Sequence, residues 1–348
     1  MRKAGSAISV VWLGARGVVV RPRALVVGLG SALLALALTV VAIGGGEFPM
    51  TPAQVVAALT GGGTPAERFI VVELRLPRAI CALLVGAALA LAGALFQSLV
   101  RNPLGSPDVL GITQGATAGA LVVVVAGGGT LALSAGALAG GLLTGAAIYL
   151  LAWKRGVHGF RLVLVGIGAT AILTGVNGFL LTRAELMEAA RALLWLTGSL
   201  DGRGWEQALP LLAGVGVLAA LVLPGSGRAL HVTEMGDDLA SGLGVRVERL
   251  RMLLLGAAVL LTSFAAAAVG PVNFVALTAP QLARRLTRAP GPNLLASMSV
   301  GAALLVAADL AAQRMFGERQ LPVGVITGVI GGGYLVWLLV AERRRGRI

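Results

Sequence analysis

Long apolar runs separated by short polar segments dominate this chain of 348 residues. A helix needs about 20 mostly apolar residues to cross the hydrocarbon core of a membrane. The run lengths predict ten such helices, with nine to eleven as the possible range. The eighth run is short and the third begins with polar residues, so we expect those two helices to be broken or tilted. The ten are expected near residues 24–45, 79–100, 109–126, 130–153, 162–182, 205–224, 251–269, 274–288, 292–313 and 323–341.

The composition agrees with this pattern. Hydrophobic residues make up 57% of the chain and charged residues only 12%, whereas a soluble domain carries about 25% charged residues. The chain also contains 51 glycines, and small residues allow membrane helices to approach one another closely. We therefore expect an all-α polytopic membrane protein that forms a single transmembrane domain over residues 1–348.

Basic residues are distributed unequally between the loops. If both termini are cytoplasmic, 20 of the 28 Lys and Arg residues lie on that side and eight on the other, as the positive-inside rule requires. Residues 1–23 then form a cytoplasmic N-terminal segment, because basic residues interrupt the apolar stretch that a signal peptide needs. The net charge of +13 reflects this topology. Nucleic-acid binding is not indicated, since the charges lie in loops between apolar runs.

The interior of the predicted bundle offers little chemistry. Asp309 is the one acidic residue expected within a span, so no chain of acids and histidines is present to carry protons. Cys81, His158 and His231 do not form a metal-binding pattern, and the chain has no Gly-Lys pair for a phosphate-binding loop. We expect no catalytic residue, no metal and no cofactor in this chain. It is either a transporter subunit driven by another protein or a self-contained secondary carrier or channel.

Two polar segments interrupt the apolar pattern on the cytoplasmic side. The first, RNPLGSPDVLGITQGA at 101–116, contains two prolines that stop a regular helix. It is either a structural turn or part of an inner closure, since irregular backbone at membrane depth occurs where protein or a water-filled cavity surrounds it. The second, residues 231–250, predicts short helices broken by Gly242 and Gly244, the first capped by Thr233. It is either a solvated loop or a docking segment for a cytoplasmic partner.

Polar and small residues within the spans give two further hypotheses. The polar ones either line a path or bond to neighbouring helices. Gly324, Gly328 and Gly332 recur every fourth residue, which predicts a close approach of the last span to another helix. The candidates for the path are Gln97, Thr174, Asn177 and Asn273.

Five stretches, in order, resemble the signatures of the FecCD-type permeases. They are RLPRAICALLVGAALALAGALFQSLVRNPLGSPDVLGITQGA (75–116), LWLTGSLDGRGWEQALPLL (194–212), MGDDLASGLGVRVERLR (235–251), GPVNFVALTAPQLARRL (270–286) and LLVAADLAAQRMFGERQLPVGVITGVIGGGYLVWLL (304–339). Such permeases are the membrane subunits of ABC importers for iron–siderophore complexes, haem and cobalamin. The variants SPDVLGIT, LTGSLDGRGW and MGDD resemble the enterobactin-type members of the family.

The resemblance implies the type II ABC importer permease fold, with ten helices per subunit in the cytoplasmic (inner) membrane. It implies a homologous second permease subunit in a heterodimer rather than a homodimer. Two separate ATPase subunits would carry ATP and magnesium, and an extracytoplasmic substrate-binding protein would deliver the cargo. The expected function is import of a ferric siderophore by alternating access, with haem or cobalamin as the alternative cargo.

The resemblance also assigns roles by position. Arg75 and Arg78, three residues apart and expected on one helix face, would dock the binding protein. The third docking arginine of the family falls near Gln313, with Arg314 beside it. Asn102, Pro103 and Asp108 would form part of the cytoplasmic gate. The residues expected to couple to the ATPase are Glu234, Met235, Asp237, Asp238, Leu239, Leu243 and Arg246.

Overall fold

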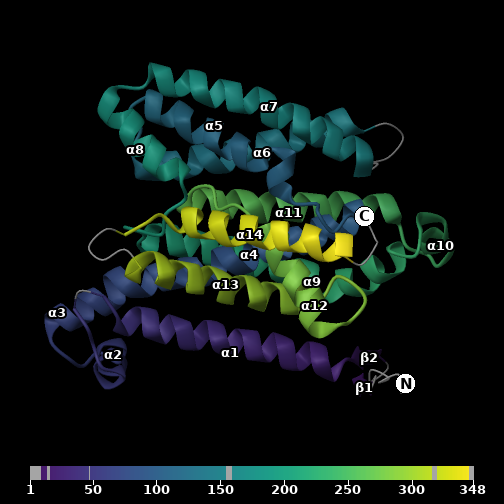
Figure 1. Ribbon diagram of the computed structural model, residues 1–348, viewed down its shortest axis with the longest axis horizontal. Helices are drawn as coiled ribbons and strands as arrows, with labels where there is room; N and C mark the ends of the chain where they lie inside the picture. The colour runs from purple at the N-terminus through teal and green to yellow at the C-terminus, as the bar shows by residue number, and fades with distance from the viewer. Residues whose placement is uncertain (1–8, 14–15, 47, 154–158, 316–319, 345–348) are drawn as a thin grey trace.

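The computed structural model describes residues 9–13, 16–46, 48–153, 159–315 and 320–344, which fold almost entirely into helices (Figure 1). A helix occupies each range in which a span was predicted. The ten are α1 (Pro22–Gly44), α4 (Leu76–Val100), α5 (Ile112–Val125), α6 (Thr130–Ala152), α7 (Gly159–Arg183), α9 (Trp205–Thr233), α11 (Val247–Val269), α12 (Val275–Thr287), α13 (Leu294–Arg314) and α14 (Val323–Arg344).

Seven helices of the described chain are long and apolar enough to cross a membrane. The shorter apolar helices are α5 and the Val323–Leu338 part of α14, and α12 has only 13 residues. The expectation of a short eighth span is therefore confirmed. Ahead of α5, the chain forms a single 3-10 turn, η2 (Pro107–Leu110), because the polar start of the third run does not support a longer helix.

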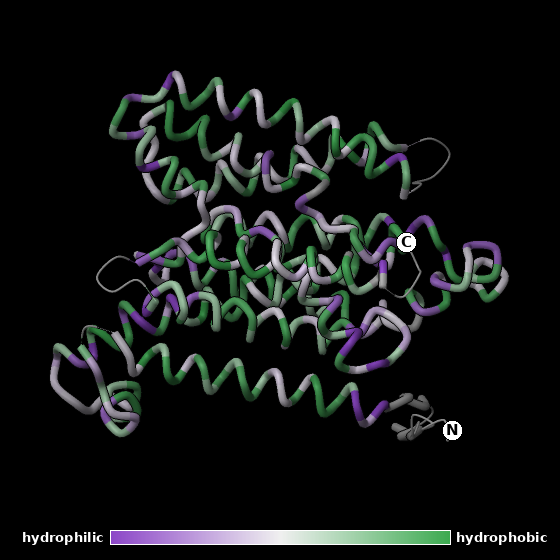
Figure 2. Tube along the Cα trace, viewed as in Figure 1, coloured by the Kyte–Doolittle hydropathy of each residue, from purple (hydrophilic) through white to green (hydrophobic). Residues whose placement is uncertain are grey.

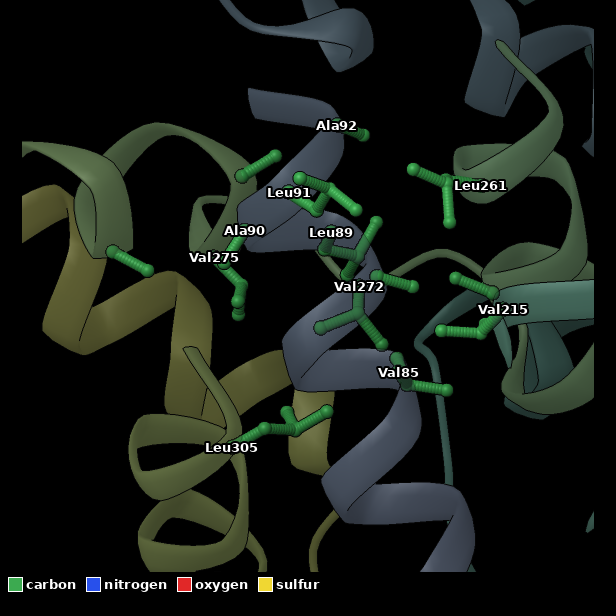
Figure 3. Packing of buried hydrophobic residues seen from close by; sticks show 14 of the residues in the cluster. Val85, Leu89, Ala90, Leu91, Ala92, Val215, Leu261, Val272, Val275 and Leu305 are labelled. Carbon is green, nitrogen blue, oxygen red and sulfur yellow. The ribbon is translucent and has the colours of Figure 1, made fainter. Parts of the chain in front are cut away.

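Helix α4 lies in the middle of the bundle. In the most apolar part of α4, 78% of residues are buried, against 17% in α1 and α7. Figure 3 shows Leu89 and Leu91 of α4 among Val215 of α9, Leu261 of α11 and Leu305 of α13. The hydrophobic core is therefore built around α4, with α1 and α7 at the periphery.

Two glycines of α4 allow α13 and α12 to pack directly against its backbone. A Cβ on Gly86 would lie 2.8 Å from the carbonyl carbon of Gly301 in α13. A Cβ on Gly93 would lie 2.6 Å from the carbonyl carbon of Ala276 in α12. Unbonded carbons normally lie about 3.5–4.0 Å apart, so neither position has room for a side chain.

The predicted glycine contact of the last span is only partly found. A Cβ on Gly324 would clash with the backbone of Thr197, but Gly328 and Gly332 have open space in the described part of the chain. Gly331, outside the predicted run, lies against Phe274 instead. Spacing alone identified Gly324 but not Gly331.

Helices α5, α6 and α7 form a layer of their own beside α11, together with the short α8 (Leu186–Leu196) (Figure 1). Figure 2 shows apolar residues along the middle of the long helices and hydrophilic residues gathered at their two ends. The start of α1, the end of α14 and the short α10 (Asp237–Gly242) lie at the same end of the bundle (Figure 1). This arrangement agrees with termini on one side of the membrane.

Several short elements were not predicted. A two-stranded antiparallel hairpin, β1 (Ser9–Leu13) and β2 (Arg16–Val20), precedes α1. Between α1 and α4 lie α2 (Pro52–Leu59), α3 (Pro65–Arg68) and a π-helical segment η1 (Phe69–Arg75). Both α2 and α3 begin with a threonine capping box, the local signal that identifies such short helices.

The prediction that Thr233 caps a short helix in the polar segment 231–250 is wrong. Helix α9 continues to Thr233, whose hydroxyl donates to the Leu230 carbonyl and does not cap a following helix. The short helix α10 begins only after Gly236, which has a positive φ of 129°. Helix α9 therefore extends past the predicted span of residues 205–224 and includes the start of the polar segment.

Candidate functional site

The polar segment around α10 projects from the cytoplasmic end of the bundle (Figure 1). Its large apolar side chains are exposed rather than packed: Met235 is 67% exposed and Leu243 is 64% exposed. Beside them lies an open groove of about 390 Å³. The charged and polar lining of the groove is Asp237, Ser241, Arg246, Glu248, Arg249 and Arg251. A surface that combines exposed apolar side chains with a charged groove is suited to binding another protein.

Asp237 connects this surface to two other parts of the molecule. Its Oδ1 accepts from Nη2 of Arg101, at the end of α4, and its Oδ2 accepts from Nη2 of Arg251, at the start of α11, at 2.8 Å. The Arg101 and Asp237 side chains are both about 40% exposed, whereas Arg251 is 15% exposed. The predicted coupling residue and the predicted gate segment are therefore joined by an ion pair. Asp238, the next residue, lies in the same first turn of α10.

The gate segment leaves α4 in an irregular path. Arg101 has a positive φ of 53°, and the Asn102 Oδ1 accepts from the Leu104 amide at 2.9 Å. The Pro103 carbonyl accepts from the Gln281 side chain of α12. Proline and asparagine thus turn the chain and present a carbonyl to a neighbouring helix, which a regular helix cannot do.

Asp108 of the same segment is nearly enclosed by protein. Its Oδ1 accepts from the Thr113 hydroxyl at 3.0 Å, while its Oδ2 is buried and has no hydrogen-bond partner among the described residues. Burial raises the pKa of the Asp108 carboxyl to about 6, because the charged form loses its hydration, and the Thr113 hydrogen bond only partly opposes this.

Gln97 belongs to a polar cluster at the same end of the bundle. Its side chain is buried, and its Nε2 donates to the Leu277 carbonyl of α12 at 3.1 Å. Its Oε1 accepts from Nη2 of Arg284 at 3.1 Å and from Gln281 at 3.4 Å. Gln97 therefore holds α4 to α12, which is the helix-bonding alternative for this residue.

The other predicted path residues are not gathered at one place. Asn177 is buried, and its Nδ2 donates to the Gln114 side chain of α5 at 2.9 Å. Thr174 is exposed, and its hydroxyl donates to the Thr170 carbonyl of its own helix. Asn273 is exposed in the turn between α11 and α12. A path-lining role for these residues stays a prediction.

At the opposite end of the bundle, Arg75 and Arg314 converge on α1. Arg75 donates from Nη1 to the Ile43 carbonyl at 2.7 Å, and Arg314 donates from Nη2 to the Val41 carbonyl at 3.1 Å. These carbonyls lie in the last turn of α1, where cations are favoured by the helix dipole. Both arginines therefore stabilise the end of α1.

Arg78 is engaged with a different partner. Its Nε and Nη2 donate to the two Asp309 carboxylate oxygens at 3.2 and 2.9 Å. The Arg78 and Asp309 side chains are only 17% and 6% exposed. Its Nη1 faces the Gln320 side chain and the exposed Asp201. Arg75 and Arg78 thus bind different elements, and both the shared helix face and docking by these arginines stay predictions.

Sequence reasoning missed the network around Asp309. Gln313, which follows Asp309 by one helical turn, donates to Oδ2 at 2.7 Å. The signal was available, since a carboxylate within a span requires a partner. The partner itself was not evident, because Arg78 lies 231 residues away in sequence. Among the residues that the structure describes, no group of three His, Cys, Asp or Glu side chains is placed to hold a metal ion.

The bundle of long apolar helices defines a multi-pass membrane protein. The family model of the FecCD transport family matches residues 33–341. The chain belongs to this family and is therefore a transport protein.

Relatives and a solved structure agree with this assignment. The ferric enterobactin transport system permease protein FepG of Escherichia coli is 45% identical over 304 residues, which cover 86% of this chain and 91% of FepG. The achromobactin transport system permease protein CbrC of Dickeya dadantii is 39% identical, covering 89% and 90% of the two chains. A metal-chelate type ABC transporter, solved in an inward-facing conformation, superposes with a TM-score of 0.79 at 26% identity over 91% of this chain and 99% of that one.

Proposed function

We propose that this chain is a permease subunit of an ATP-driven importer that moves a ferric siderophore into the cytoplasm by alternating access. The similarity to FepG and CbrC, whose names specify ferric enterobactin and achromobactin transport, supports the cargo class. The observation that carries the mechanism is Asp237, which joins the exposed cytoplasmic surface to the gate segment through Arg101 and to α11 through Arg251.

The energy for transport comes from a separate ATPase in this proposal. One ATPase subunit binds the surface formed by Glu234, Met235, Leu239, Leu243 and Arg246, and ATP with magnesium stays on that partner. Closure of the ATPase moves α10, and the Asp237 ion pairs transmit the displacement to the end of α4 and the start of α11. Asn102, Pro103 and Asp108 then change the inner opening.

The assembly requires further partners. A homologous second permease subunit completes a heterodimer with two ATPase subunits, and the open face of α14 at Gly328 and Gly332 is suited to a close helix contact. An extracytoplasmic binding protein docks at the end of the bundle that carries Arg75, Arg78 and Arg314. Because Arg78 is paired with Asp309, docking there uses its Nη1 edge beside Asp201.

The cargo is tested by uptake in cells that lack only this chain. Iron-labelled ferric enterobactin, a ferric hydroxamate, haem and labelled cobalamin are supplied separately, with and without a plasmid that restores the chain. We expect restored uptake of a ferric siderophore and no change for haem or cobalamin. Restored haem or cobalamin uptake instead would refute the cargo. Accumulation of solute by the purified chain alone, driven by an ion gradient in vesicles, would refute the ATP-driven mechanism.

A further inference from the structure

We propose that the loop between α12 and α13, together with the start of α1, binds the phosphate headgroup of an anionic phospholipid at the cytoplasmic face of the membrane. The observation behind this proposal is that two arginines at the start of α1 bond to carbonyls of a short loop that itself carries a third arginine, Arg288. It does not depend on the nature of the transported cargo.

Two regions of the sequence carry only positive charge. Residues 1–46 contain five basic residues and no acidic residue, and residues 270–308 contain three arginines and no acidic residue. The fold brings these regions together, because α1 packs along α13 and against α12. Their cytoplasmic ends meet at the loop that follows α12.

Two of the arginines are fixed by backbone carbonyls of this loop. Arg23 donates from Nε to the Leu286 carbonyl at 2.8 Å, and Arg21 donates from Nη1 to the Pro290 carbonyl at 2.7 Å. Arg288 lies between these two carbonyls in sequence, and its side chain is exposed. Each carbonyl contact engages one nitrogen of the guanidinium group and leaves the others for a second partner.

The backbone of the loop is held by its own contacts, so the carbonyls that fix Arg21 and Arg23 keep their positions. Asn293 donates from Nδ2 to the Ala289 and Gly291 carbonyls at 3.0 Å. Arg288, Gly291 and Asn293 all have positive φ values, which gives the chain a tight course between the two helices. Side-chain and backbone contacts together fix the course of the loop that carries Arg288.

No carboxylate of the described residues forms an ion pair with Arg21, Arg23 or Arg288. The acidic group on the other side of the loop is Glu234, which faces His231 at 3.9 Å. Three neighbouring positive charges repel one another and therefore favour an anion between them. The fork of a guanidinium group matches the oxygens of a phosphate, which makes a phosphodiester the favoured ligand.

The surface below the arginines is apolar, which indicates a lipid rather than a soluble anion. Leu25 and Leu29 of α1 are 47% and 58% exposed, and Leu295 at the start of α13 is 66% exposed. Figure 2 shows mostly hydrophobic residues following the hydrophilic start of α1 along the helix. A headgroup at the arginines would place its acyl chains along this face. Basic pockets between membrane helices on the cytoplasmic side are known to hold anionic lipids.

The test uses the purified transporter complex in nanodiscs of phosphatidylcholine with increasing phosphatidylglycerol. Bound phosphatidylglycerol is counted by native mass spectrometry. The variant Arg21→Gln, Arg23→Gln, Arg288→Gln removes the cluster. The matched control Arg161→Gln, Arg343→Gln, Arg344→Gln removes three other arginines near cytoplasmic ends of helices, one of which also donates to a backbone carbonyl.

We expect the apparent affinity for phosphatidylglycerol to fall about fivefold for each arginine removed from the cluster and to stay unchanged in the control. Equal losses in both variants would show general attraction to the membrane surface and would overturn the proposal. Competition by inorganic phosphate at millimolar concentration would also overturn it, because the site would then bind a free anion. If the triple variant does not fold, Arg288→Gln alone must still weaken binding about fivefold, with Arg288→Lys as the charge-retaining control.

Discussion

Replacing Gly93 with alanine tests whether α4 and α12 are packed backbone to backbone. The added Cβ would lie 2.6 Å from the carbonyl carbon and 3.0 Å from the Cα of Ala276. An ordinary carbon contact of about 3.5–4.0 Å requires the helices to separate by about 1 Å. Such overpacking typically costs about 1–3 kcal/mol, and it outweighs the gain of up to about 1 kcal/mol in helix propensity from glycine to alanine.

Gly168→Ala is the matched control, since this glycine lies within α7 and has no atom within 4 Å of the added Cβ. Thermal unfolding of the detergent-purified protein, followed by tryptophan fluorescence, measures both variants. We expect a lower melting temperature for Gly93→Ala and an unchanged or slightly higher one for Gly168→Ala. Equal melting temperatures for Gly93→Ala and the wild type would refute the close approach of α4 and α12. Gly86→Ala repeats the test against α13, where the Cβ would lie 2.8 Å from the Gly301 carbonyl carbon.

Three further predictions concern the charged groups. Asp309→Asn leaves the partly buried Arg78 charge without its main partner, so we expect a loss of about 3 kcal/mol in unfolding free energy. Most of this stability should return in the double variant Asp309→Leu, Arg78→Met. An unchanged unfolding free energy in Asp309→Asn would contradict the pair. The Asp108 pKa is raised from 3.8 to about 6. Ionisation of Asp108 therefore lowers the unfolding free energy progressively between about pH 4 and pH 6, and the full loss is present above pH 6. Asp108→Asn should therefore be more stable than the wild type at pH 7.5 by up to about 3 kcal/mol, with the difference lost near pH 4 in paired melting curves; a pH-independent difference would exclude this cause. Arg101→Ala leaves Asp237 paired with Arg251, so stability should change by less than about 1 kcal/mol, because the Arg101 and Asp237 side chains are both exposed. The variant should lower cargo-stimulated ATP hydrolysis several-fold in the reconstituted complex, and the charge-retaining Arg101→Lys should keep most of it; equal loss in both variants would argue against the ion pair as the cause.

The membrane spans and their orientation follow from local sequence. Span length is set by the thickness of the hydrocarbon core, and the side of each loop by its Lys and Arg content, so neither requires knowledge of neighbouring helices. The short helix α12 and the irregular segment after α4 could be predicted for the same reason. The family could also be predicted, because its signatures are continuous stretches such as residues 75–116 and 270–286.

Local sequence was less informative about boundaries between elements. Thr233 has the side chain of a helix cap but lies in the last turn of α9. The strands β1 and β2 lie in a stretch for which the sequence predicts only a cytoplasmic segment, because basic residues interrupt its apolar run. At such positions, several local conformations are close in free energy, and tertiary contacts select one of them.

The partner of each polar or small residue was decided only by tertiary structure. Gln97 and Asn177 have the same polar character whether they face a path or another helix, and the fold places both against neighbouring helices. Arg78 meets Asp309 across 231 residues of sequence, and Gly93, among 51 glycines, is one that meets a backbone. The physical reason is that helix neighbours are selected by the sum of many weak packing contacts over the whole bundle, whereas the length, polarity and charge of a span are properties of one continuous segment in its surrounding lipid.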